Sequence, residues 1–431
     1  MTSRLLVVTV GGAPEPVVTS LLHWRPARAV FIVTAQTRDA IAREIFPRVQ
    51  QGGWAEFDAG RYDLHELPDP QDFNGIVDRL RGLDHVVGGW TRDHPGAEVI
   101  TDLTGGTKAM SAGLALAAMR WPCRFSYVGG TERTKGGVGV VVSGREQVLQ
   151  TLNPADTLGL LALDSALELL RTHAFAAAEA VLQQAVRRVT EPARKAELGA
   201  VSSLAGALAD WDCFQHRTAL NKLRELPRHT HNLAAALGPA IVPAALAATS
   251  RLTTHLAAIV AAGPGGPSRP LILDLLANAR RRLDERRWDD ATARLYRVVE
   301  ATAQFHLAAA GLPSTSAVPL VKVPEPLRGR LTPYASDGLA RLGLQDAWEL
   351  LQHLRPDVVR PFAEASLDHR EKSPLVARNQ SILAHGFAPV SEKLARQLFA
   401  IALKLLPARE TDLPEAPTAA LNLPSATLNP P

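Results

Sequence analysis

The sequence predicts an α/β domain followed by two regions built of helices alone. Over residues 1–152, short runs of β-branched and apolar residues alternate with helix-forming stretches. This alternation is typical of a mostly parallel sheet with helices on both faces. After Asn153, Ala- and Leu-rich segments with helical periodicity replace the strand signals. We therefore expect an all-α connecting region over 153–265, an all-α domain over 268–408 and a Pro-rich, disordered tail over 409–431.

Composition limits the classes of function. The chain has 431 residues, of which 46% are hydrophobic and 21% charged, so it is a globular protein of several domains. A net charge of +4 permits an anionic partner without requiring one. Cys123 and Cys213 are too few for a disulfide framework or a zinc site, which favours a cytoplasmic protein. Because we find no apolar run of roughly 18–20 residues, we expect no membrane partner.

Each expected element of the α/β domain has its own pattern. The expected strands are LLVVTV (5–10), AVFIVT (29–34), YDLHEL (62–67), AEVITDLT (97–104) and RFSYVGG (124–130). Helices are expected after the first strand and over 38–50, 71–87 and 107–120, and GGVGVVVSG (136–144) with VLQTLNP is expected to form a closing hairpin.

A glycine-containing loop follows the fourth expected strand. The stretch TDLTGGTK brings two glycines, Thr104, Thr107 and Lys108 to the start of a helix. Backbone N–H groups and the positive end of the helix dipole make such a loop a cradle for phosphate. The loop after the first strand, which contains Thr9, Gly11 and Gly12, is expected to open on the same edge of the sheet. The pattern is neither a Walker loop nor a dinucleotide fingerprint, and it also fits a tight turn with solvent-facing Thr and Lys.

The segment ARNQSILAHGF places an arginine, an asparagine and a histidine in an apolar helical stretch. We expect a helix over 374–385, in which Arg378 and His385 lie about 10 Å apart along the axis. Two copies meeting across a two-fold axis would bring one arginine close to the partner's histidine. Arginine grips phosphate, and a histidine at a helix C-terminus is a good proton donor. Spacing alone also fits a surface helix with solvated polar groups.

Taken together, the two motifs resemble a known protein family. DLTGGTKAMSAGLALAA resembles the signature of CARF domains, which are Rossmann-like sensors, and RNQSILAHG resembles the Arg-Asn-x₄₋₆-His signature of HEPN ribonucleases. The stretch RLYRVVEATAQFHLAAAGL (294–312) is similar to an early HEPN helix. The order of the two domains resembles the ancillary CARF–HEPN ribonucleases of type III CRISPR systems, the Csm/Csx group. The middle helices show no resemblance that we can place.

The resemblance implies a function. A CARF homodimer would bind a cyclic oligoadenylate of four or six adenylates, and the HEPN dimer would then cleave single-stranded RNA in antiviral defence. Cleavage would need no metal or other cofactor, because the 2′-hydroxyl attacks its own phosphate and leaves a 2′,3′-cyclic phosphate. The catalytic residues would be Arg378, Asn379 and His385. The ligand-binding residues would be Thr9, Gly11, Gly12, Thr104, Gly105, Gly106, Thr107 and Lys108.

Three further residues are expected to support the catalytic segment, namely Ser381, Tyr296 and Glu300. Tyr296 and Glu300 are four residues apart on one helix face, and Ser381 shares the side of Arg378. Two alternatives stay open: a sensor that binds cyclic oligoadenylate without cleaving RNA, and a CARF domain that also degrades its ligand. For ligand degradation, Thr9 or Thr107 would supply positioning donors.

Overall fold

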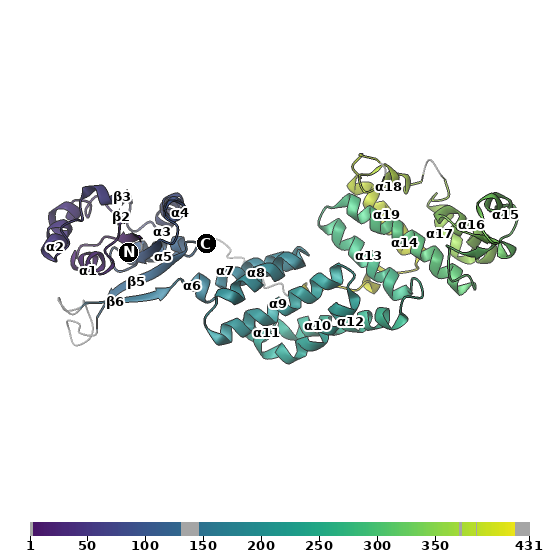
Figure 1. The fold of residues 1–431 in the computed structure, drawn as a ribbon, viewed down its shortest axis with the longest axis horizontal. Helices are drawn as coiled ribbons and strands as arrows, with labels where there is room; N and C mark the ends of the chain where they lie inside the picture. Colours follow the sequence, from purple (N-terminus) through teal and green to yellow (C-terminus); the bar gives the residue numbers. More distant parts are fainter. Residues whose placement is uncertain (1–2, 131–145, 370–372, 385, 419–431) are drawn as a thin grey trace. The chain divides into compact units, whose positions relative to one another are not determined.

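The computed structural model describes residues 3–130, 146–369, 373–384 and 386–418 (Figure 1). The chain divides into two compact units, residues 1–161 with 188–191, and residues 162–187 with 192–431. The first unit contains a sheet with helices, and the second is almost entirely helical. The predicted fold class is therefore confirmed. The expected strand GGVGVVVSG (136–144) lies outside the described residues.

A six-stranded sheet with the order β3-β2-β1-β4-β5-β6 organises the first unit. The pairs from β3 through to β5 are parallel, and β6 is antiparallel to β5. Because the chain leaves β1 toward β2 and later returns to β4 on the other side of β1, strand order reverses between β1 and β4. The strands are β1 (Arg4–Thr9), β2 (Arg28–Val33), β3 (Tyr62–Glu66), β4 (Glu98–Asp102), β5 (Cys123–Gly129) and β6 (Gln147–Leu152).

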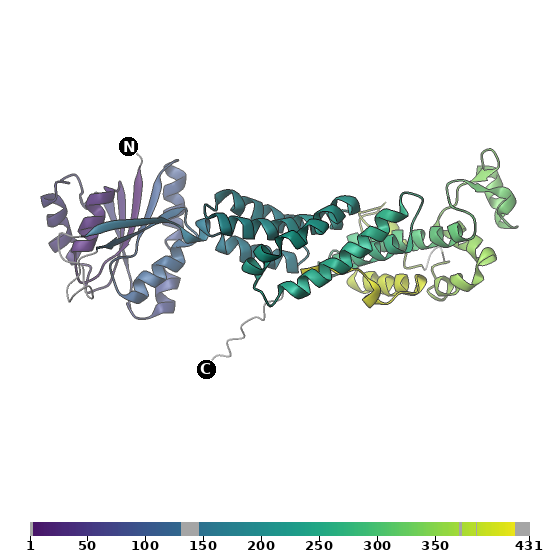
Figure 2. The ribbon, with the colours of Figure 1, turned by 90° about the horizontal axis from the view of Figure 1, so that it is seen from below.

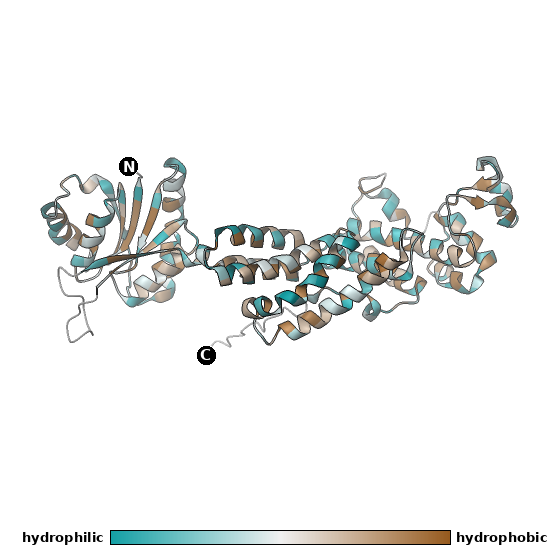
Figure 3. Ribbon diagram, turned by 60° about the horizontal axis from the view of Figure 1, so that its bottom comes forward, coloured by the Kyte–Doolittle hydropathy of each residue, from teal (hydrophilic) through white to brown (hydrophobic). Residues whose placement is uncertain are grey.

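Helices cover both faces of this sheet (Figure 2). Alternate residues of β1 point to opposite faces, so Leu5 packs with α3 (Phe73–Arg81) and α5 (Lys108–Ala118). Leu6 packs with α1 (Glu15–Trp24) and α2 (Phe46–Gln51). The central strands are hydrophobic along most of their length, as Figure 3 shows. A strand buried on both faces has this composition because neither side meets water.

Two expected helices of the first unit have different boundaries in the structure. The stretch 71–87 forms α3 and a separate helix, α4 (Asp84–Asp93). Gly82 lies between them, and its N–H bonds back to the carbonyl oxygens of Arg79 and Leu80, which closes α3. The stretch 38–50 begins as a π-helical turn over Ile41–Ile45 before α2. A 3₁₀ turn, Ala59–Arg61, precedes β3.

Helices then carry the chain through the middle region. These are α6 (Pro154–Thr157), α7 (Leu160–Arg171), α8 (Phe175–Arg188), α9 (Pro192–Asp212), α10 (His216–Glu225), α11 (Thr230–Leu237) and α12 (Val242–Ala262), with a 3₁₀ turn at Leu226–His229. By length and composition alone, α12 is long and apolar enough to cross a membrane, and 28% of its most apolar window is buried inside the structure. This helix packs against α10, α11 and α13 (Arg269–Asp284).

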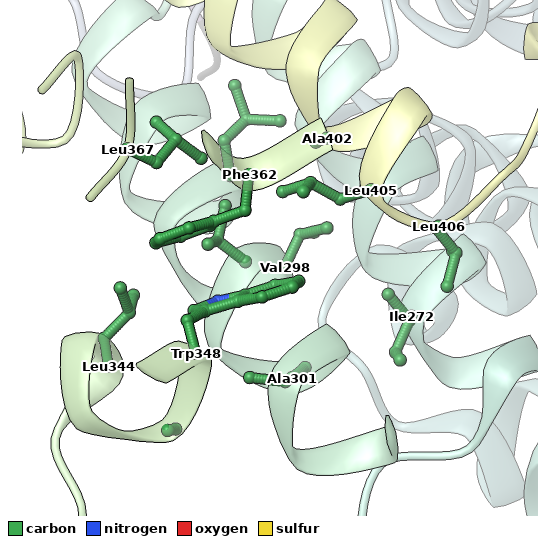
Figure 4. Packing of buried hydrophobic residues seen from close by; sticks show 14 of the residues in the cluster. Ile272, Val298, Ala301, Leu344, Trp348, Phe362, Leu367, Ala402, Leu405 and Leu406 are labelled. Carbon is green, nitrogen blue, oxygen red and sulfur yellow. The ribbon is translucent and has the colours of Figure 1, made fainter. Parts of the chain in front are cut away.

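The C-terminal helices surround α14 (Trp288–Ala309). Their core includes Trp348, whose ring stacks on that of Phe362 at 4.5 Å beside Val298 of α14 (Figure 4). The other elements are α15 (Leu327–Leu331), α16 (Leu344–Leu354), α17 (Pro356–Glu364), α18 (Val376–Gln380), α19 (Glu392–Leu405), the short strands β7 (Val318–Pro319) and β8 (Leu339–Ala340), and 3₁₀ turns at Leu320–Lys322, Thr332–Tyr334 and Glu410–Asp412.

Part of the expected disordered tail, within 409–418, is buried against the helical unit. Leu413 is only 8% exposed and Thr418 only 5%. Arg280 of α13 pairs with Glu410, and Arg269 donates a hydrogen bond of 2.7 Å to the carbonyl oxygen of Leu406. Buried Leu413 and the ion pair of Arg280 with Glu410 anchor 409–418, although its composition lacks a core pattern, and the Arg269 contact fixes the chain just before it.

Candidate functional site

The loops after β1 and β4 meet at the point where strand order reverses. Val8 pairs with Asp102 in the parallel register, so the two strands end side by side. The hydroxyl of Thr9 donates a hydrogen bond of 2.6 Å to the carbonyl oxygen of Gly105, which ties one loop to the other. Ligands of doubly wound sheets bind in the crevice beside such a point. The expected ligand-binding residues on both loops therefore lie at one edge of the sheet.

Close backbone contact explains the glycines of these loops. A Cβ on Gly105 would lie 2.0 Å from the carbonyl oxygen of Thr9, and one on Gly11 would lie 2.7 Å from the nitrogen of Gly106. Gly106 also has a φ of +77°, which side chains disfavour. Gly12 differs, because it is exposed and a Cβ there would meet no atom within 4 Å. Three of the four glycines are thus required by the loop itself.

Asp102, at the end of β4, organises the loop and was missed as a site residue. Its carboxyl group is fully buried and accepts hydrogen bonds of 2.8 Å from the hydroxyls of Ser20 and Ser126. It also accepts one of 2.9 Å from the N–H of Thr104. A polar residue at the carboxyl end of a buried parallel strand is the signal that could have found it.

The polar side chains of the loop divide into two groups. The Thr104 hydroxyl accepts a hydrogen bond of 2.7 Å from the N–H of Val128. Thr107 caps α5, since its hydroxyl accepts from the N–H of Met110 at 3.2 Å, and it donates to the carbonyl oxygen of Pro70 at 2.7 Å. Lys108, by contrast, is exposed at the start of α5. The loop can therefore offer an anion the ammonium group of Lys108 and the N-terminus of α5.

The stretch ARNQSILAHGF (377–387), here called the Arg-Asn segment, contains a shorter helix than expected. The structure ends α18 at Gln380, whereas the sequence predicts a helix over 374–385. Ser381 has extended backbone, and its hydroxyl and N–H both donate to the carbonyl oxygen of Arg378, at 2.8 and 3.1 Å. In a continuing helix, the carbonyl oxygen of Arg378 would accept from the N–H four residues later, but both groups of Ser381 already donate to it. The prediction of one continuous helix over 374–385 is therefore wrong.

The chain then folds back on the end of α18. The N–H of Gly386 donates to the carbonyl oxygen of Ser381 at 3.2 Å, and the N–H of Ala388 donates to that of Gln380 at 3.0 Å. A Cβ on Gly386 would lie 2.1 Å from the Gln380 oxygen, so glycine is needed for this closure. His385, the expected proton donor, lies outside the described residues.

Aromatic packing and one amide hold the Arg378 side chain. Its guanidinium carbon lies 4.7 Å from the centroid of the Tyr296 ring, on α14. Its Nη1 donates a hydrogen bond of 3.2 Å to the side-chain oxygen of Asn379. Its Nε is buried and has no hydrogen-bond partner among the residues that the structure describes. A cation–π contact fixes the plane of the guanidinium while leaving N–H groups for a phosphate.

The expected supporting residues have distinct places. Ser381 is 1% exposed and serves the end of α18. Glu300 pairs with Arg297 at 3.2 Å on the same helix. Burial, and then the charge of Glu300, raise the pKa of Tyr296, and the charge of Arg378 opposes them. The phenol therefore stays neutral near pH 7, and its ring is available to Arg378.

No cluster of three or more His, Cys, Asp or Glu side chains that could hold a metal ion occurs among the described residues.

The two units define a class of protein: a Rossmann-like domain with a glycine loop at its switch point, joined to a helical domain that carries an Arg-Asn segment beside a long central helix. Residues 266–408 match the family model described as Csm6 HEPN domain. The chain is similar to the solved structure of Enterococcus italicus Csm6 bound to cyclic hexa-2′-fluoro-hexa-dAMP. The two share 13% identity at a TM-score of 0.51, over 98% of this chain and 99% of that one. No curated protein matches the chain.

The family model confirms the predicted resemblance to HEPN proteins for residues 266–408, and the structural match confirms the predicted order of an α/β domain followed by helical domains. The structural match also includes the middle helices, for which the sequence suggested no relative.

Proposed function

We propose that the protein is a single-stranded RNA endoribonuclease activated by a cyclic oligoadenylate, and that it acts as a homodimer without a metal ion. The observation that carries this proposal is the held guanidinium of Arg378. It lies on the ring of Tyr296, within the region that matches the Csm6 HEPN model. A positively charged, planar group with unused N–H donors suits the phosphate of an RNA chain.

In the proposed reaction, the chain's own groups stabilise charge and move one proton. The 2′-oxygen of a ribose forms a bond to the adjacent phosphorus, and the bond from phosphorus to the 5′-oxygen breaks. Arg378, oriented by Tyr296 and Asn379, stabilises the negative charge that develops on the phosphoryl oxygens. His385 of the second copy donates the proton that the departing 5′-oxygen takes up, and the 2′-hydroxyl proton passes to solvent.

The activator would bind at the switch point of the sheet. Its phosphates would lie at the start of α5 beside Lys108, and its rings would approach the loop after β1 at Gly12, which is exposed and has open space at its Cβ position. The neighbouring structure from E. italicus holds a ring of six nucleotides. This neighbour supports cyclic hexaadenylate as the first ring to test on this chain.

The test is an RNA-cleavage assay with each cyclic oligoadenylate in turn and with EDTA present. We expect cleavage with one ring size, and products that end in a 2′,3′-cyclic phosphate. Arg378→Ala and His385→Ala should abolish cleavage while leaving activator affinity unchanged. Lys108→Ala should raise the activator concentration needed for half-maximal cleavage and leave the maximal rate intact. Cleavage that is lost in EDTA, or that survives His385→Ala, contradicts the proposal.

A sensor that binds or degrades its ligand without cutting RNA is the alternative function. The hydroxyls of Thr9 and Thr107, which would have positioned a ligand for degradation, already donate to Gly105 and Pro70. These two side chains therefore give degradation no support. Incubating labelled ligand with His385→Ala protein separates the alternatives, because the HEPN site is then silent.

A further inference from the structure

One face of helix α14 contacts both Arg378, in the Arg-Asn segment, and Val390, which follows that segment. Near its start, Asp289 accepts a long hydrogen bond of 3.4 Å from the N–H of Val390, just after the loop that follows α18. Two turns later, Tyr296 holds the guanidinium of Arg378. Seven residues of helix separate the two, so their side chains differ in direction by only about 20°. Any movement of α14 therefore moves both contacts together.

A different face of α14 is joined to the middle helices. Arg294 is turned by about 140° from Asp289 around the helix axis. Its Nε donates a hydrogen bond to the side-chain oxygen of Asn278 on α13. The Asn278 amide nitrogen in turn donates to Asp212, the last residue of α9, at 2.9 Å to the carbonyl oxygen and 3.0 Å to the carboxylate. Two hydrogen-bonded steps thus connect the end of α9 to α14.

The surroundings make this connection stiff. Asn278 is 0% exposed. The Asp212 carboxylate also accepts from Arg281 and Arg282, each at 2.8 Å, and the Arg281 guanidinium lies 3.8 Å from the centroid of the Trp211 ring. Breaking such contacts leaves buried polar groups unpaired, which is costly. The hydrogen-bonded group of Asp212, Asn278 and Arg294 therefore resists gradual distortion, because any partial shift would leave a buried polar atom without its partner.

We propose that Asn278 and Arg294 are positioning residues for the ribonuclease site. They fix α14 relative to the middle helices, and α14 in turn fixes the guanidinium of Arg378. The middle helices lie in sequence between the sheet and α13, so an activator signal that reaches α9 has a direct route to the catalytic arginine. This inference rests on the proposed function for its role in catalysis, but the mechanical link itself can be measured without RNA.

The test is a double-mutant cycle on the full chain, with Asn278→Leu, Arg294→Met and the pair. We expect each single variant to lower kcat for activated cleavage about tenfold with KM for RNA unchanged, and the pair to fall less than about twofold further. Affinity for cyclic hexaadenylate should stay within twofold of the wild type. Arg330→Met is the matched control, since it breaks an exposed ion pair with Glu349 on α15 and α16 and should leave kcat unchanged.

A structural role alone gives a different result. In that case kcat falls only in proportion to the folded fraction measured by circular dichroism, or the two single effects multiply in the pair. Either result overturns the proposal. If Asn278→Leu does not fold, Arg294→Lys is measured instead, alongside Arg294→Met. Lysine retains the positive charge of Arg294 but cannot form the Nε hydrogen bond to Asn278. Unchanged kcat in both Arg294 variants also overturns the proposal.

Hydrogen exchange separates this inference from the proposed function. Adding cyclic hexaadenylate and cyclic tetraadenylate in turn to wild-type protein should change amide exchange in α18, and Arg294→Met should remove that change. If the wild type shows the change but cuts no RNA, the proposed function fails while the positioning link stands. No change in the wild type with either ring, or an equal change in wild type and variant, overturns the link.

Discussion

The guanidinium of Arg378 lies over the ring of Tyr296, with 4.7 Å between the guanidinium carbon and the ring centroid. This contact joins the short helix of the Arg-Asn segment to the long central helix of the domain. A cation–π contact of this kind contributes about 0.5–2 kcal/mol, depending on desolvation. If it orients Arg378 in the transition state, its loss should appear directly in the cleavage rate.

The first prediction concerns that ring. Tyr296→Leu should lower the rate of activated RNA cleavage by about tenfold, since 1.36 kcal/mol corresponds to a factor of ten in rate. Tyr296→Phe keeps the ring and should stay within about twofold of the wild type. Initial rates at saturating activator check both variants. Equal losses in the two would point to the phenol hydroxyl instead of the ring face.

The second prediction concerns the glycine loop. In Gly105→Ala, the new methyl group would lie 2.0 Å from the carbonyl oxygen of Thr9, so the loops after β1 and β4 must separate. We expect weaker binding of cyclic oligoadenylate and a lower midpoint of thermal unfolding. Gly89→Ala on α4 is the matched control, because its methyl group meets no atom within 4 Å and alanine favours helix. Unfolding midpoints that do not differ between these variants would contradict the prediction.

The third prediction concerns the buried carboxyl group at the end of β4. Asp102→Ala removes the acceptor of three hydrogen bonds, from Ser20, Ser126 and the N–H of Thr104. Unpaired buried donors cost about 1–3 kcal/mol each, and neighbouring groups re-pair in part, so we expect a loss of about 3 kcal/mol in the free energy of unfolding. Urea denaturation measures it. A loss below about 1 kcal/mol would mean that the loop does not depend on this residue.

The fourth prediction concerns pH. Burial, with a smaller contribution from His216, lowers the pKa of His255 below its ordinary value of 6.5, although Asp274 opposes the shift. The unfolded chain therefore binds a proton more readily than the folded chain below pH 6.5, and stability falls as the pH falls. We expect the wild type to lose more stability than His255→Gln between about pH 7.5 and about pH 5.5. Urea denaturation at both pH values checks the difference, and equal losses would assign the pH dependence to other groups.

The sequence predicted most of the α/β unit because its signals are local. Runs such as LLVVTV and AVFIVT became β1 and β2 within one residue, since a strand buried on both faces must be apolar throughout. The meeting of the loops after β1 and β4 followed from the parallel sheet, whose strands end on one edge. The break at Gly82 was missed because one glycine inside a helical pattern does not show whether the helix ends there.

The Arg-Asn segment was harder to predict. Its catalytic residues stay a prediction from spacing and resemblance, and the predicted helix over 374–385 is too long, because α18 ends at Gln380. Ser381 ends the helix by bonding back to Arg378, and nothing in helical periodicity distinguishes such a serine from one inside a helix. The importance of Asn278 was likewise hidden, because its partners Asp212 and Arg294 are 66 and 16 residues away.

The sequence by itself determined the fold class, the central strands and the position of the glycine loop, because each depends on residues that are neighbours along the chain. Only the tertiary structure decided that Tyr296 holds Arg378, that Asp102 organises the loop and that Asn278 joins α9 to α14. These contacts form between segments that are distant in the sequence, where buried polar groups must be paired. The hydrophobic periodicity of the sequence does not predict which groups pair.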